Sequence, residues 1–169
     1  PSDRGSALLA TLAVFAGGFL ARPVGGWLFG RIGDRYGRKF TLVLTMCLLA
    51  LTSLAIALLP TYEQAGVLAS VLLFACRLMQ GLAHGGESGV AYTYVAEIAP
   101  PAKRGLWSSS VFVSVTLGVM AATALAALLT AWLGKPAMEA WGWRVGFGVG
   151  ALLGVYALFL RRSASESEV

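Results

Sequence analysis

The sequence predicts an all-α, polytopic membrane protein with five transmembrane helices, and three observations lead to that prediction. Of its 169 residues, 57% are hydrophobic and 12% are charged, and soluble domains carry about twice that charged fraction. The apolar residues form runs of about twenty, the helix length that crosses roughly 30 Å of hydrocarbon. The Lys and Arg residues lie mostly between or after these runs, as they do in loops at a membrane surface.

The hydrophobic runs and the turn signals between them fix the predicted elements. Arg22 and Pro23 interrupt the first span, and Pro60 begins a short turn after the second. Gly134 and Pro136 indicate a further turn, and Arg161 with Arg162 ends the last span. No domain boundary is evident within the chain. The predicted spans cover residues 7–29, 40–59, 65–95, 106–133 and 145–160, with cytoplasmic loops at 30–39 and 97–105.

The distribution of basic residues predicts the orientation in the membrane. Eight of the thirteen Lys and Arg residues lie in the 30–39 segment, in Lys103–Arg104 and in Arg161–Arg162. Three others, Arg4, Lys135 and Arg144, fall on the opposite side. Because basic residues are retained on the cytoplasmic side, the C-terminus is predicted to be cytoplasmic and the N-terminus external. Loop cations in contact with the lipid bilayer account for the net charge of +5 without a nucleic-acid partner.

The segment GRIGDRYGRK between the first two runs resembles the signature loop of the major facilitator superfamily. That superfamily has twelve spans in two six-helix halves, so the resemblance implies that this chain matches spans two to six, most of the N-terminal bundle. The first span and the C-terminal half of the same transporter are then expected to lie outside the chain. The matching positions, expected to take part in gating, are Gly30, Asp34, Arg35, Gly37, Arg38 and Lys39.

Four polar residues of the third span lie on one face of a helix: Arg77, Gln80, His84 and Glu87. At 100° per residue they fall within an arc of about 80°. Charged groups do not face lipid at low cost, so this stripe should face the bundle interior or a water-filled cavity. It either lines a substrate or proton pathway or forms a structural network that joins helices. His84 is either a titrating proton relay or a residue hydrogen-bonded to Gln80 or Glu87.

Further motifs narrow the resemblance. RLMQG in the third span is similar to a fourth-span motif of the same superfamily. GGESG in the third span and FLARPVGG in the first resemble motifs of the metabolite:proton symporter group. Arg22 either extends its side chain to the cytoplasmic interface or contacts an anionic substrate. YVAEIAPPAKRG resembles a superfamily loop in which Glu97 and Arg104 are the acid and the base. We expect Arg38 and Glu97 to pair across the cytoplasmic face and act as a gate. The alternative is that these charges only solvate the loops and fix the orientation of the helices in the membrane.

These features predict a proton-coupled symporter in the plasma membrane that carries a small polar metabolite, a carboxylate or a zwitterionic osmolyte. Arg77 should pair with a carboxylate outside this chain or with the substrate, and Glu87 should bind the proton. The alternative is a structural or channel-like helical subunit. The chain lacks the HExxH, GxSxG and phosphate-loop motifs, so no enzyme, cofactor or metal site is predicted. Cys47 and Cys76 fall in apolar runs and should be buried thiols.

Overall fold

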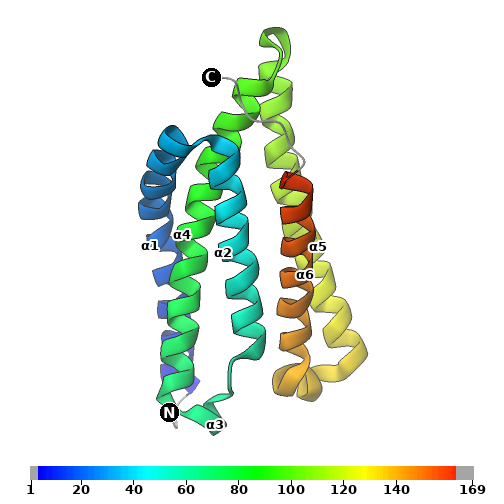
Figure 1. The fold of residues 1–169 in the computed structure, drawn as a ribbon. Helices are drawn as coiled ribbons and strands as arrows, with labels where there is room; N and C mark the ends of the chain where they lie inside the picture. The colour runs from blue at the N-terminus through cyan, green and yellow to red at the C-terminus, as the bar shows by residue number, and fades with distance from the viewer. Residues whose placement is uncertain (1–3, 163–169) are drawn as a thin grey trace.

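The computed structural model describes residues 4–162, and nearly all of them are helical (Figure 1). This range contains no strand, which confirms the predicted all-α class. The five long helices are α1 (Arg4–Tyr36), α2 (Arg38–Leu58), α4 (Val67–Ile98), α5 (Arg104–Ala137) and α6 (Trp143–Arg162). Three short elements connect them: α3 (Tyr62–Ala65), the 3-10 helix η1 (Pro101–Lys103) and the π-helix η2 (Met138–Gly142).

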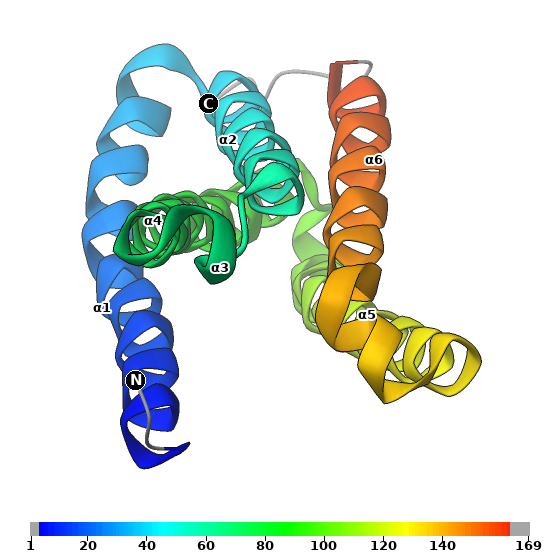
Figure 2. The same cartoon turned by 90° about the horizontal axis from the view of Figure 1, so that it is seen from below.

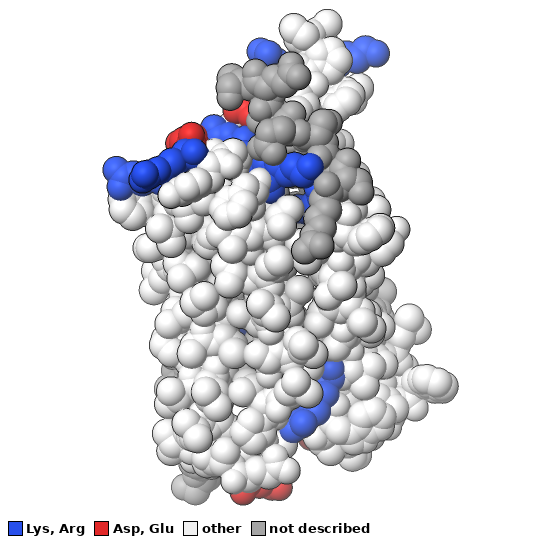
Figure 3. Space-filling view, in the orientation of Figure 1, with Lys and Arg blue, Asp and Glu red and all other residues white. Residues whose placement is uncertain are grey.

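The helices have the length and the surface of membrane spans. Four described segments are long and apolar enough to cross a membrane, and the last of them, Pro101–Arg161, turns back at Gly134 to give both α5 and α6. Large apolar side chains face outward, with Leu20 76% and Trp132 89% exposed. Figure 3 shows a broad uncharged belt, with most of the visible Lys and Arg residues at one end. The chain is therefore a multi-pass membrane protein, surrounded by lipid along this belt.

Three basic segments lie at the same end of the bundle. The α1–α2 turn, the α4–α5 connection and the end of α6 are together at the top of Figure 1, and α3 and η2 lie at the opposite end. This grouping is the one expected from the count of basic residues. The predicted cytoplasmic tail, 163–169, and residues 1–3 fall outside the described residues. Which end faces the cytoplasm remains a prediction.

The turn between α1 and α2 is much tighter than the predicted loop at 30–39. Helix α1 continues to Tyr36 and α2 begins at Arg38, so Gly37 alone separates them. Gly37 has φ 97°, a conformation that other residues rarely adopt. The loop prediction was wrong because it equated the end of the apolar run with the end of the helix, although charged residues continue a helix readily beyond the hydrocarbon. Helix α1 also passes through Pro23 without interruption.

The other predicted connections are also more helical than expected. Helix α4 runs to Ile98, so Glu97 lies on a helix rather than in a loop, and η1 fills most of the gap before α5. After Pro60 the chain forms the short helix α3 within the predicted turn. Gly134, with φ 76°, breaks the helical conformation near the end of α5. The π-helix η2 then leads directly into α6. Glycines therefore mark the α1–α2 and α5–α6 turns, whereas the η1 segment connects α4 to α5.

Glycines bring α1 and α4 into direct backbone contact. A Cβ atom built at Gly25, Gly81 or Gly85 would overlap the backbone of the facing helix, as in membrane helix pairs that meet through small residues. Helix α2 packs against both α4 and α6. In Figure 2, α1 and α6 lie on opposite sides of the pair formed by α2 and α4. Helix α5 contributes no buried residue and lies at the outside of the described bundle.

Candidate functional site

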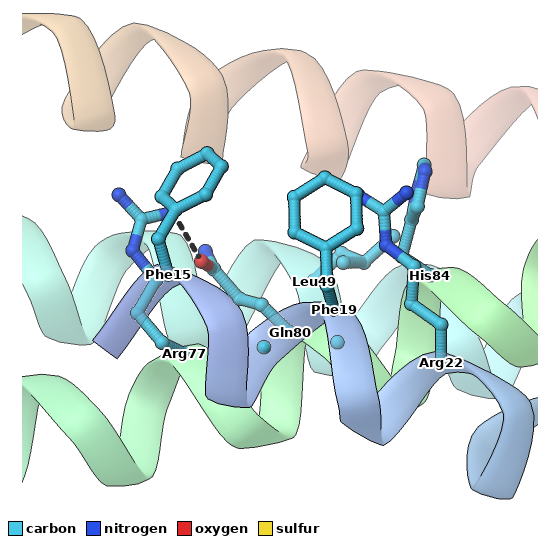
Figure 4. A pocket seen from close by; sticks show the side chains of 9 residues that line it. Phe15, Phe19, Arg22, Leu49, Arg77, Gln80 and His84 are labelled. Carbon is cyan, nitrogen blue, oxygen red and sulfur yellow. Dashed lines mark hydrogen bonds between the residues drawn. The ribbon is translucent and has the colours of Figure 1, made fainter. Parts of the chain in front are cut away.

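A pocket of about 210 Å³ lies among α1, α2 and α4. Four of its lining residues are polar, and all four were predicted from the sequence: Arg22, Arg77, Gln80 and His84. None of the lining residues is acidic, so the pocket carries a positive charge. Figure 4 shows Arg22 on α1 facing the same space as His84 and Gln80 on α4. The remaining lining residues are Phe15, Gly18, Phe19, Leu49 and Gly81.

Arg77 is held by neutral partners from its own helix and from α6. Its Nη1 donates a hydrogen bond to Gln80 Oε1 at 3.0 Å, and Gln80 Nε2 donates to Ser53 Oγ of α2 at 3.2 Å. The guanidinium carbon lies 5.2 Å from the centroid of the Phe147 ring. Among the described residues no carboxylate pairs with Arg77, so its charge remains available to an anion.

Arg22 turns toward the pocket rather than toward the end of α1. Its guanidinium carbon lies 4.1 Å from the centroid of the Phe19 ring, which is one turn nearer the N-terminus. This direction leads away from the basic end of the bundle. In this structure Arg22 does not extend toward the basic end of the bundle, and its contact with an anionic substrate stays a prediction.

His84 lines the pocket without the hydrogen bond that the sequence suggested. Gln80 is bonded to Arg77 and Ser53 instead, and Glu87 is paired with Arg161. Arg22 and Glu87 both act electrostatically on the imidazole. The alternative in which His84 is held by Gln80 or Glu87 is therefore wrong in this structure, and its role in proton transfer remains a prediction.

The polar stripe of α4 divides between two places. Arg77, Gln80 and His84 line the pocket, whereas Glu87 forms an ion pair with Arg161 in the last turn of α6. The Glu87 side chain is 16% exposed and that of Arg161 is 27% exposed. Arg161 Nη1 also donates to the Leu42 carbonyl of α2 at 3.3 Å. Glu87 thus joins helices near the basic end of the bundle and does not line the pocket.

The predicted pair between Arg38 and Glu97 is present. Arg38 Nε lies 3.5 Å from Glu97 Oε1, and Arg38 Nη1 lies 2.8 Å from Asp34 Oδ1. Arg104 is exposed at the start of α5, and Glu97 contacts Arg38 rather than this base of its own motif. Gly30, Asp34 and Arg35 lie in the last turns of α1, and Lys39 lies in the first turn of α2.

Sequence reasoning missed several residues that shape these sites. Phe15 and Phe19 line the pocket, Phe147 packs against Arg77, and Ser53 completes the hydrogen bonds of Gln80. Ser53 could have been suspected, because it is one of few polar residues in α2. The aromatic residues gave no such signal, since apolar side chains are expected throughout a membrane helix.

Comparisons with known proteins extend these observations. A family model described as "Sugar (and other) transporter" matches residues 2–168. The chain is 45% identical over 160 residues to an alpha-ketoglutarate permease of Escherichia coli (strain K12), covering 95% of this chain and 37% of that protein. It is 45% identical over 159 residues to a protein of Staphylococcus haemolyticus named "Putative proline/betaine transporter", covering 94% of this chain and 34% of that protein.

A solved structure supports the same fold. The xylose transporter XylE of E. coli, in a partially occluded inward-open conformation, matches with a TM-score of 0.85 and 21% identity. The match covers 99% of this chain and 42% of that chain. The chain therefore spans between 34% and 42% of the length of these three proteins.

The apolar helices, the basic pocket and the charge pair at one end define part of a major facilitator superfamily transporter, as predicted. The chain belongs to the sugar (and other) transporter family. This is a family of transporters and not of enzymes.

Proposed function

We propose that this chain forms part of a secondary active transporter that carries a small polar metabolite together with protons by alternating access. The transported molecule is a carboxylate or a zwitterionic osmolyte. The transporter is completed by a first span and a second helical half beyond these residues. It acts in the plasma membrane, with the Gly37 end of the bundle in the cytoplasm.

The basic pocket is the observation that carries this proposal. Arg22 and Arg77 present two guanidinium groups within a membrane bundle, and no acidic residue lines the pocket with them. A guanidinium binds a carboxylate through two parallel hydrogen bonds, which gives both affinity and orientation. Gln80 and His84 add polar groups for the rest of the substrate. The names of the E. coli and Staphylococcus relatives are consistent with a carboxylate or a zwitterion.

Uptake by the full-length transporter, reconstituted in vesicles, tests the substrate class. Radiolabelled 2-oxoglutarate and radiolabelled proline are supplied outside in separate samples with an inward proton gradient, and unlabelled succinate, proline, betaine or xylose is added as a competitor. We expect a carboxylate or a zwitterion to compete and xylose to have no effect. Competition by xylose alone would contradict the assignment, and the absence of any saturable uptake would favour a structural or channel-like subunit.

Glu87 is the proposed proton site. It is a largely buried carboxylate on the helix that also carries Arg77, Gln80 and His84. We expect Glu87→Gln to retain exchange of labelled for unlabelled substrate and to lose accumulation driven by a pH gradient, because the amide cannot take up a proton. Exchange and accumulation are measured on the same vesicles. Accumulation at the wild-type level in Glu87→Gln would remove this residue from the coupling mechanism.

A further inference from the structure

Arginines at both ends of α6 attach this helix to α2. At the start of α6, Arg144 Nη2 donates to the Leu59 carbonyl at 2.8 Å. In its last turn, Arg161 Nη1 donates to the Leu42 carbonyl at 3.3 Å. Between these two ends the helices pack closely, since a Cβ at Gly154 would lie 2.9 Å from the Cβ of Ala50. Helix α6 is therefore held on α2 along its whole length.

The attachments made by Arg144 and Arg161 differ in the partners that hold each arginine. Leu59 is the C-cap residue of α2, and its carbonyl has no donor within that helix, which makes it a good acceptor for Arg144. The Leu42 carbonyl already accepts the Thr45 hydroxyl at 3.2 Å. Arg161 therefore depends on its second partner, the Glu87 carboxylate of α4, with which it forms an ion pair. Among the described residues no carboxylate pairs with Arg144.

The charged and titratable groups near Glu87 come from four helices. Arg161 of α6 contacts it directly. His84 lies one turn earlier on α4 and is influenced by Glu87 and by Arg22 of α1. Lys39 of α2 lines a second pocket together with Arg161. Within the described chain, Arg161 is the cation in ion-pair contact with Glu87, so a change in the charge of Glu87 acts first on Arg161.

We propose that Arg161 is a positioning residue for proton coupling: protonation of Glu87 releases Arg161, and the Arg161 end of α6 then separates from α4 while Arg144 holds the other end on α2. This inference rests on the proposed proton-coupled function. Protonation of Glu87 removes the Coulomb attraction between its carboxylate and the Arg161 guanidinium, which is strong where water is largely excluded. A neutral Glu87 therefore holds the guanidinium weakly. Because Arg161 lies in the last turn of its helix, its side chain can instead reach water and lipid phosphates.

The second pocket is the place where this release becomes measurable. It has a volume of about 250 Å³ and is lined by α2, α4, α5 and α6 residues, including Val95, Val111 and Arg161. When Arg161 leaves Glu87, the wall that α6 supplies moves away. Water and small reagents should then reach Val95 more readily, although Val95 belongs to neither arginine attachment.

The experiment measures alkylation of a cysteine at Val95 in the full-length transporter in lipid nanodiscs. Cys47 and Cys76 are replaced by Ala, as are any cysteines elsewhere in the protein, and each rate is divided by the rate for the unfolded protein at the same pH. At about pH 7.5 we expect Glu87→Gln and Arg161→Gln to react roughly tenfold faster than the parent, within the usual range of coupling energies. Arg161→Lys and the matched control Arg144→Gln should react at the parent rate.

Two results would overturn the inference. One is a Glu87→Gln variant that reacts at the parent rate, and the other is an Arg144→Gln variant that accelerates the reaction as much as Arg161→Gln does. The measurement requires no transport, so it separates the two proposals. The alkylation rates can follow the expectation while the same protein shows no pH-driven accumulation. In that case the inference about Arg161 stands, and the proposal of proton-coupled uptake is wrong.

Discussion

Arg38 at the start of α2 lies against Glu97 in the last turn of α4, with Nε 3.5 Å from Oε1. Both side chains are about four-fifths buried, at 20% and 19% exposure, whereas the second acid on Arg38, Asp34, is 66% exposed. The other carboxylate oxygen of Glu97, Oε2, is buried and has no hydrogen-bond partner among the described residues. Glu97 therefore depends on Arg38, whereas Asp34 can be solvated by water.

Exchange of the charges of Arg38 and Glu97 tests whether this contact acts as a gate. We expect Arg38→Glu and Glu97→Arg each to shift the transporter toward the inward-open state by about 1–3 kcal/mol, and the double exchange to restore part of the wild-type distribution. Spin-label distances across the cytoplasmic face of the full-length protein report the distribution. Arg104→Glu is the matched control, since Arg104 is exposed on the same face. A double variant no better than either single variant would exclude direct pairing.

Replacement of Arg77 tests the basic pocket. Arg77→Ala should weaken substrate binding by about 2 kcal/mol or more, roughly 30-fold, because a desolvated charged contact is lost. Arg77→Lys should restore little of the substrate binding, because lysine keeps the positive charge but lacks the planar guanidinium that binds a carboxylate at two points. Binding is measured by calorimetry on the purified full-length protein, alongside uptake. Arg31→Ala removes an exposed cation from α1 and is the control for membrane insertion. Wild-type binding by Arg77→Ala would place the substrate elsewhere.

The contact between α1 and α4 predicts a position-dependent cost for replacing glycine. Gly85→Val places its side chain on the Arg22 backbone and should destabilise the protein by about 1–3 kcal/mol or more. Gly118→Ala, on α5, meets no atom within 4 Å and should be neutral or slightly stabilising. Thermal unfolding of the purified full-length protein compares them. Equal melting temperatures would show that α1 and α4 are not packed this closely in the membrane.

Thiol labelling on intact cells tests the orientation. Ser2 and Ser165, near the two ends of the sequence, are natural positions for such labels, but both lie outside the described residues. The structure supplies a better pair: Tyr36, beside the α1–α2 turn, and Glu63 on α3, which are both exposed and lie at opposite ends of the bundle. We expect an impermeant reagent to label Glu63→Cys from outside and Tyr36→Cys only after lysis. Labelling of both from outside would contradict the assigned topology.

The sequence predicted features that local composition controls and missed those that depend on contacts between helices. Apolar length and helical periodicity were enough to predict the all-α fold and to put Arg77, Gln80 and His84 on one face. The separation of Glu87 from these three residues could not be predicted, because it results from Arg161, far away in the chain, reaching α4. Helix ends were missed for a different reason. Hydropathy detects where lipid ends, whereas Gly37 and Gly134 determine where the helices end.

The glycine contact between α1 and α4 has a consequence for selectivity. Arg22 and Arg77 stand on two backbones that touch each other, so the spacing between their α-carbons cannot change unless that contact opens. We therefore expect the two guanidinium groups, which stand on helices at a set separation, to select a substrate of matching length. A flexible pocket would adapt to a longer dicarboxylate, but this pair has only the rotamers of two arginine side chains with which to do so.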